Sequence, residues 1–285
     1  MTASSEHPLH VLHVGSAGPR VAFLHGLFGQ GRNWNQIAKA VAGQDGSGAR
    51  CALVDLPDHG RSRHTSEFSF TSYAAHVAAT LRQLAPGEPW TVVGHSLGGK
   101  TAMVLALTEP ELVERLCVVD IAPKHYGDLH RFGGYIDAMT AMDLEAIETR
   151  QDADAMLAQT VPQPWIRAFL LQNLRRHHDT WRWQVNLPLV RADRDRGSES
   201  VIADFPIAPG EHEPYEGPVV WLVGSDSEYV HDEDVEPMRE LFPRARLVTV
   251  NGAGHWVHTD APEVVIEVIR RMLDGPSGSG DDPPR

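Results

Sequence analysis

A serine lies at the centre of a glycine-flanked pentapeptide, G-H-S-L-G at residues 94–98, and this stretch constrains the fold more than any other. An apolar run at residues 90–93 precedes it, and a helix-forming run at residues 99–107 follows it. This order predicts a strand, a sharp turn and a helix, with Ser96 at the apex. Glycine on either side lets the strand and the helix approach closely. Ser96 is therefore a candidate nucleophile, and a turn with a capping serine is the alternative.

Short apolar runs alternate with helical patterns on both sides of this turn. Buried strands are predicted at residues 20–24, 50–55, 90–93, 115–120, 218–223 and 245–250. Such alternation predicts an α/β fold, with a mostly parallel central sheet and helices on both faces. Ligands bind such sheets at the carboxyl ends of the strands, and several polar side chains fall there: His25, Asp55, Ser96 and Asp120.

The alternation stops between residues 124 and 217, where the pattern is helical and no convincing buried strand occurs. We expect residues 1–123 and 218–274 to form the core and residues 124–217 to form a helical cap insertion. Residues 275–285 have the composition of a disordered tail. Residues 9–14 alternate in polarity before a glycine-containing turn, which predicts an edge hairpin.

Composition excludes several classes of partner. The formal net charge is -13 and no cluster of Lys and Arg occurs, which argues against nucleic acid. No apolar stretch approaches the roughly 20 residues of a membrane span, so no integral membrane segment is expected. The two cysteines, Cys51 and Cys117, lie in apolar runs and predict buried thiols. A polar N-terminus without an apolar leader makes the cytoplasm the expected compartment.

A nucleophilic serine needs a neutral imidazole to accept its proton. Of the 16 histidines, His255 is the candidate because it follows the last predicted strand in the glycine-containing run N-G-A-G-H at residues 251–255. His95 is expected to pack or hydrogen-bond beneath the turn, and His25 is expected to be structural. His177 and His178 lack partners at metal-ligand spacing, so neither a metal site nor a cofactor is predicted.

The imidazole in turn needs a carboxylate that fixes its tautomer. Two candidates compete for this role. Asp120 ends the strand that follows the 99–107 helix, whereas Asp226 follows the strand at residues 218–223. The alternatives are a loop anchor for Asp120 and a turn cap for Asp226.

Four motifs, taken in order, resemble those of the α/β-hydrolases: H-G-L-F-G at 25–29, D-L-P-D-H-G-R-S at 55–62, G-H-S-L-G-G at 94–99 and G-A-G-H-W at 252–256. The resemblance covers nearly all of the chain outside the insertion and the tail. It implies Ser96 as nucleophile, His255 as base and the backbone N–H groups of Leu27 and Leu97 as oxyanion donors. It also implies a helical cap where the insertion falls.

The chain departs from the family pattern at two positions. The family acid usually lies three residues past a glycine. Counted from Gly224, that position is Ser227, and Asp226 lies one residue before it. A subset that resembles small intracellular acyl esterases has D-I-A-P at the earlier strand end and serine at the later position, as here. This favours Asp120 as the acid, with Ser227 making a secondary hydrogen bond. The second departure is Asp58, where the family loop normally has glycine.

These features predict a serine esterase that hydrolyses a small-molecule acyl ester or thioester through an acyl-enzyme. Aromatic residues of the insertion are expected either to line an apolar acyl pocket or to form the core of the cap: Trp165, Phe169, Trp181 and Trp183. The alternatives are a cofactor-free haloperoxidase or a carbon-carbon bond hydrolase on the same three residues. A ligand receptor without turnover is a further alternative.

Overall fold

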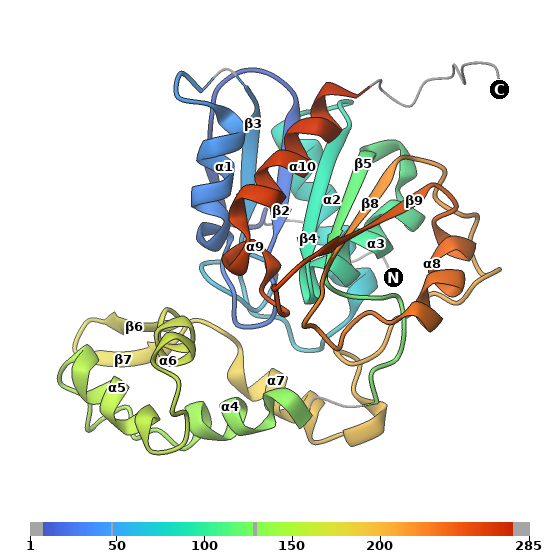
Figure 1. Cartoon of the computed structure of the whole chain (residues 1–285). Helices are drawn as coiled ribbons and strands as arrows, with labels where there is room; N and C mark the ends of the chain where they lie inside the picture. Colours follow the sequence, from blue (N-terminus) through green and yellow to red (C-terminus); the bar gives the residue numbers. More distant parts are fainter. Residues whose placement is uncertain (1–7, 47, 128–129, 276–285) are drawn as a thin grey trace, which may run out of the picture.

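The computed structural model describes residues 8–46, 48–127 and 130–275, and in these ranges one sheet of seven strands organises the molecule (Figure 1). The spatial order is β1-β3-β2-β4-β5-β8-β9. All neighbouring pairs are parallel except β1 with β3. The strands are β1 (Val11–Val14), β2 (Arg20–Leu24), β3 (Arg50–Val54), β4 (Trp90–His95), β5 (Val113–Val119), β8 (Val219–Gly224) and β9 (Ala245–Val250).

The first strand lies at the sheet edge, as predicted, but the predicted hairpin is wrong. β1 pairs with β3 in an antiparallel register, Val11 opposite Val54, and β3 separates it from β2. Burial agrees with the edge position of β1. The side chains of β2 and β3 are buried except at their first residues, whereas those of β1 are exposed or only partly buried.

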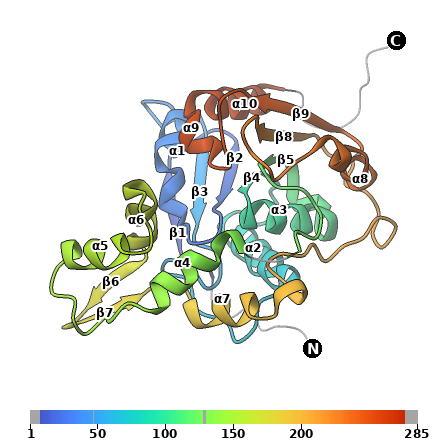
Figure 2. The same ribbon diagram turned by 60° about the horizontal axis from the view of Figure 1, so that its bottom comes forward.

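Helices cover both faces of the sheet, as predicted (Figures 1 and 2). One face packs against α1 (Asn35–Ala42), α9 (Val257–Asp260) and α10 (Pro262–Asp274). The other packs against α2 (Phe70–Leu84), α3 (Leu97–Thr108) and α8 (Val235–Leu241). The helix α2 shows why the sequence pattern was readable. Ser69 caps its N-terminus by accepting from the Ser72 N–H at 3.3 Å, and one apolar face of the helix is buried from Phe70 to Leu81, whereas Leu84 in the last turn is exposed.

Residues 124–217, called the cap below, lie between β5 and β8, beyond the carboxyl ends of the central strands (Figure 1). Their described elements are α4 (His130–Thr140), α5 (Arg150–Ala158), α6 (Pro164–Leu171), β6 (Leu174–His177), β7 (Thr180–Trp183) and α7 (Leu187–Arg194). Short 3-10 helices complete the chain: η1 (Gly31–Trp34), η2 (Pro110–Leu112), η3 (Gly197–Glu199) and η4 (Asp232–Asp234).

The expectation of a purely helical cap is wrong at one place. β6 and β7 form an antiparallel hairpin with Leu174 opposite Trp183 and Arg176 opposite Trp181. The alternation W-R-W at residues 181–183 has the period of a strand, and it was the signal that the helical interpretation missed. α4 ends at Thr140, and in the segment that follows it Asp143 Oδ1 accepts from the Glu145 N–H.

Both cysteines are buried and unpaired, as predicted. No helix within the described ranges has both the length and the apolarity that crossing a bilayer requires. The predicted tail, apart from Gly275, lies outside the described residues.

Candidate active site

The turn at residues 94–98 joins β4 to α3 and carries Ser96 in a strained backbone conformation, with φ 51° and ψ -118°. The two glycines make this turn possible. A Cβ on Gly94 would lie 2.3 Å from the Gly98 carbonyl oxygen, and one on Gly98 would lie 2.5 Å from the carbonyl oxygens of Leu24 and His25. α3 begins at Leu97, so the N–H groups of its first turn are directed toward the space beside Ser96.

His255 joins Ser96 to Asp120. Its Nε2 lies 3.1 Å from Ser96 Oγ, and its Nδ1 lies 2.8 Å from Asp120 Oδ2. A carboxylate accepts only, so Nδ1 carries the proton and Nε2 is left to accept from the serine hydroxyl. The three side chains come from three strand ends that are far apart in the sequence, and the fold places them in one hydrogen-bonded row.

Asp120 is fully buried and is held on both carboxylate oxygens. Gly224 N–H donates to Oδ1 at 3.0 Å, and Ser227 Oγ donates to Oδ2, the oxygen that faces His255. Asp226 is exposed and its carboxylate accepts from Ser225 Oγ at 2.9 Å. The structure therefore brings Asp120 and Ser227 to the imidazole, and it leaves Asp226 on the surface of the turn.

The loop at residues 25–29, called the HG loop below, packs directly on the serine turn. His25 is buried; its Nδ1 donates to the Gly26 carbonyl oxygen at 2.8 Å, and its Nε2 accepts from the Leu56 N–H at 3.0 Å. Burial lowers the pKa of His25 to about 3, so it stays neutral. This agrees with the structural role predicted for it. Leu27 and Leu97 both line the cavity into which Ser96 opens.

His95 lies beneath the serine turn, as predicted. Its Nε2 lies 2.8 Å from the backbone carbonyl oxygen of His255, so the residue before the serine supports the loop that carries the imidazole. Burial, followed by the neighbouring His258 and His255, holds the pKa of His95 well below its usual value. His95 is therefore neutral and donates one hydrogen bond to that carbonyl.

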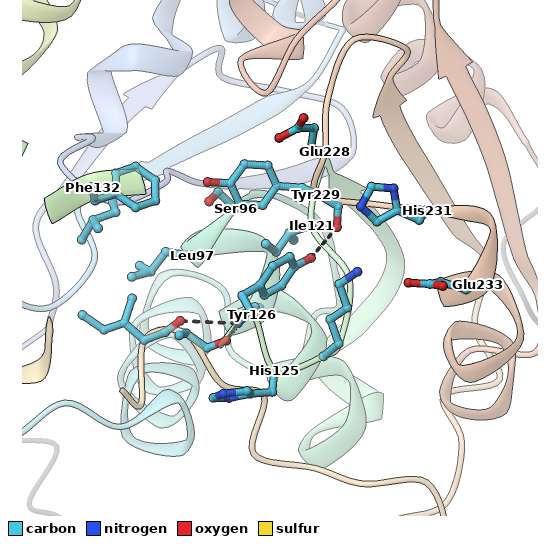
Figure 3. A pocket seen from close by; sticks show the side chains of 15 residues that line it. Ser96, Leu97, Ile121, His125, Tyr126, Phe132, Glu228, Tyr229, His231 and Glu233 are labelled. Atoms are coloured by element: carbon cyan, nitrogen blue, oxygen red, sulfur yellow. Dashed lines mark hydrogen bonds between the residues drawn. The ribbon is translucent and has the colours of Figure 1, made fainter. Parts of the chain in front are cut away.

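A cavity of about 450 Å³ opens beside Ser96 (Figure 3). Leu97 and Phe132 lie toward one end, and His231 and Glu233 lie at the other. Lys100 also lines the cavity but is buried, and its ammonium donates to the carbonyl oxygens of Ala203 at 2.8 Å and Asp204 at 2.6 Å. The site thus has an apolar end and a charged end.

The four cap aromatics proposed for the acyl pocket are not among the residues that line this cavity. Trp165 and Phe169 pack edge-on against Trp256, with ring centroids 5.0 and 6.4 Å away. Trp181 and Trp183 lie in the hairpin and pack against the hydrophobic core that includes the buried side chains of α2, α3 and the cap. The cap residues that do line the cavity include Tyr126, Phe132 and Ile202, which the sequence pattern did not distinguish from other apolar positions.

A family model described as the alpha/beta hydrolase fold matches residues 19–262, and these include all four motifs. The chain belongs to this family. The sn-1-specific diacylglycerol lipase ABHD11 of Mus musculus is 39% identical over 259 residues, covering 90% of this chain and 81% of that protein. Esterase YbfF of Escherichia coli is 28% identical over 258 residues, covering 89% and 92% of the two chains. A solved structure described as a marine microorganism esterase superposes with TM-score 0.85 at 31% identity, covering 93% of this chain and 98% of that one.

Within this family framework, the departure at Asp58 has a structural explanation. Asp58 takes up φ 65°, a conformation that favours glycine, yet its carboxylate is fully buried. Thr65, Tyr73 and Asn186 all donate to it, Asn186 Nδ2 at 2.7 Å. These donors outweigh burial and lower its pKa. The carboxylate thereby ties the loop after β3 to Asn186, which caps α7 in the cap.

Sequence reasoning missed other residues around the site. Tyr126 Oη donates to the Tyr229 carbonyl oxygen at 2.7 Å, and the Tyr229 ring stacks on His255. The one signal in the sequence that could have indicated Tyr229 is its position two residues after Ser227. In the described residues no group of three or more metal-ligating side chains comes together.

Proposed function

We propose that the chain is a serine carboxylesterase that hydrolyses small or medium acyl esters or thioesters through an acyl-enzyme on Ser96. The observation that carries this proposal is the row of hydrogen bonds in which His255 contacts Ser96 Oγ at 3.1 Å and Asp120 Oδ2 at 2.8 Å. The lipase and esterase names of its relatives support ester hydrolysis as the reaction class.

In the first half of the reaction, His255 Nε2 takes the proton of Ser96 as Oγ attacks the carbonyl carbon. The carbonyl oxygen becomes an oxyanion, which the backbone N–H groups of Leu27 and Leu97 stabilise. The position of Leu97 at the start of α3 supports this role, because the helix dipole favours negative charge there. The protonated imidazole then gives its proton to the departing alcohol or thiol, and the acyl group stays on Ser96.

In the second half, His255 takes a proton from water, and the hydroxide attacks the acyl-enzyme. Collapse of the second tetrahedral intermediate releases the carboxylic acid and returns the proton to Ser96. Asp120 holds the imidazole tautomer and stabilises the imidazolium that forms in both halves. Ser227 donates to Asp120 Oδ2, and we propose that this hydrogen bond from a neutral side chain orients the carboxylate.

The cavity supports a small or medium substrate. Its volume of about 450 Å³ lies within the range of roughly 300–1,000 Å³ typical of small-molecule sites. We propose that the acyl chain lies toward Leu97 and Phe132 and that the leaving group faces His231 and Glu233 (Figure 3). We further propose that the segment at residues 124–217 acts as the cap that completes this cavity, since Tyr126 and Phe132 belong to it.

A fluorophosphonate probe and p-nitrophenyl esters of graded acyl length test the proposal. The probe should label the wild-type protein at Ser96, and Ser96→Ala should abolish labelling and lower ester turnover at least about a thousandfold. Circular dichroism of both proteins checks that the fold is retained. Labelling at another residue, or undiminished turnover by Ser96→Ala, contradicts the proposal. Bromination or carbon-carbon cleavage without ester turnover favours the haloperoxidase or the carbon-carbon hydrolase instead.

A further inference from the structure

The HG loop holds a conformation that its own sequence does not favour. Gly29 N–H donates to the Gly26 carbonyl oxygen at 2.9 Å, which closes a tight turn with Leu27 and Phe28 at its centre. Phe28 takes up φ 61°, at a turn position where glycine or asparagine is usual. A phenylalanine side chain offers no local hydrogen bond in compensation. Contacts from elsewhere must therefore hold the turn.

Those contacts come from the cap. The Phe28 carbonyl oxygen accepts from Asn173 Nδ2 at 2.7 Å and from Gln172 Nε2 at 3.1 Å. Both residues directly follow α6, which ends at Leu171. Two donors converge on one carbonyl oxygen and fix the peptide plane that follows Phe28.

Asn173 is fully buried, and its amide is fully engaged. Its Nδ2 also donates to the Leu170 carbonyl oxygen at 3.2 Å, and its Oδ1 accepts from Gln30 Nε2 at 3.1 Å. Since carbonyl oxygens only accept, the amide has one orientation that satisfies all three contacts. Asn173 thus grips the HG loop at Phe28 and the chain immediately after it at Gln30.

The HG loop in turn contacts the serine turn with no space between them. A Cβ on Gly26 would lie 2.8 Å from His95 Nδ1 and 3.3 Å from Ser96 Cβ. Any rotation of the turn at residues 26–29 therefore changes where the Leu27 N–H points relative to Ser96. Catalysis by an oxyanion donor depends on its aim at the position of the developing charge.

We propose that Asn173 is a positioning residue that holds the oxyanion donor Leu27 in place from the cap. This inference rests on the proposed function, because it takes Leu27 N–H as a donor to the oxyanion. On this account the cap acts on the chemistry itself, in addition to lining the cavity. Gln172 supports the same carbonyl through its longer hydrogen bond.

Two variants and a matched control test this. Asn173→Leu is similar in size and removes the shorter of the two hydrogen bonds to the Phe28 carbonyl oxygen. Asn186→Leu removes another buried amide that joins the cap to the core, and the side-chain hydrogen bonds of Asn186 go to Asp58, Thr65 and Leu189 and not to the HG loop. Gln172→Leu is the milder second variant, for use if Asn173→Leu does not fold.

The measurements are kcat and KM for p-nitrophenyl butyrate and the affinity for an alkyl trifluoromethyl ketone. The ketone forms a tetrahedral adduct whose oxyanion occupies the same place as that of the transition state, whereas the matching alkyl amide stays planar. Asn173→Leu should lower kcat about 10- to 100-fold, which is no more than the loss caused by removing one oxyanion donor altogether. KM should stay within about threefold of the wild-type value. Ketone affinity should fall in parallel and amide affinity should not.

Gln172→Leu should show a smaller loss of the same kind, and Asn186→Leu should keep wild-type kcat and ketone affinity. Unchanged ketone affinity in Asn173→Leu, or in Gln172→Leu if the first variant does not fold, overturns the inference. Equal losses in Asn173→Leu and Asn186→Leu also overturn it, because they indicate general loosening of the cap. A wild-type protein that neither turns over esters nor reacts with fluorophosphonate refutes the proposed function separately.

Discussion

Tyr229 stacks on His255, with ring centroids 3.8 Å apart and an angle of 18° between the planes. The backbone of Tyr229 is itself fixed, since its N–H donates to Ser227 Oγ at 3.3 Å and its carbonyl oxygen accepts from Tyr126 Oη at 2.7 Å. The tyrosine ring therefore covers one face of the imidazole, which also makes hydrogen bonds at both nitrogens. This arrangement limits rotation of the ring out of the plane shared by Ser96 and Asp120.

Replacing Tyr229 tests the importance of this contact. Tyr229→Phe keeps the ring and should retain more of the wild-type kcat than Tyr229→Ala. Tyr229→Ala removes the stack and should lower kcat about tenfold, because misplacing a catalytic group by about 1 Å can cost as much as a hundredfold in rate. Steady-state kinetics with p-nitrophenyl esters measures both variants. Equal activity of the alanine and phenylalanine variants would show that the hydrogen bonds alone hold the imidazole.

The acid is tested by comparing two asparagine variants. Asp120→Asn keeps the shape of the side chain but favours the wrong imidazole tautomer, and the same change in a serine protease costs about 10⁴ in kcat. We expect a loss of similar order for Asp120→Asn. Asp226→Asn alters an exposed side chain that contacts Ser225, so turnover should stay near the wild-type level. A larger loss in Asp226→Asn than in Asp120→Asn would assign the role to Asp226.

Buried histidines make the fold sensitive to acid. His25, His59 and His95 are buried, and burial is the first cause that lowers the pKa of each, that of His25 to about 3. The unfolded chain binds protons near pH 6.5, where the folded protein does not. Stability contributed by these neutral rings is therefore complete above pH 6.5 and is lost as the pH falls below it.

The loss should approach about 1.4 kcal/mol per pH unit for His25, whose pKa in the folded protein is about 3, and the other two histidines should add to it in the same direction. Urea unfolding at pH 7, 6 and 5 measures it. His59→Leu should reduce the slope of stability against pH, because it removes one buried neutral histidine. The variant should fold, since within the described residues the His59 ring makes one hydrogen bond, from Nδ1 to the Pro57 carbonyl oxygen at 2.9 Å, and Nε2 makes none. His13→Ala changes an exposed histidine and serves as the control. An unchanged slope in His59→Leu would contradict this account.

Much of the core was predictable because its signals are local. The strands at residues 20–24 and 90–93 are short apolar runs, and buried parallel strands need no other pattern. The edge position of β1 also followed from its alternation. Its partner did not, because β1 pairs with β3, which is not the next strand along the chain. The hairpin in the cap was missed because two four-residue strands give a weaker signal than the helices around them.

The candidate site divides in the same way. Ser96 and His255 were identified from glycine-rich segments whose geometry is set within a few residues. Asp120 and Asp226 were harder to distinguish as candidates for the acid, because each places a carboxylate at or just after the end of a predicted strand. The resemblance to a family favoured Asp120, and the hydrogen bond to His255 is a contact across 135 positions of the chain.

The sequence by itself determined where strands, helices and the serine turn form, because backbone sterics and hydrophobic periodicity act over a few residues. Only the tertiary structure decided which side chains meet. Tyr229 against His255, Asn173 against Phe28 and Asn186 against Asp58 are contacts between segments brought together by packing of the cap and the sheet. Their hydrogen bonds and ring contacts depend on the aim of individual side chains, which local pattern does not encode.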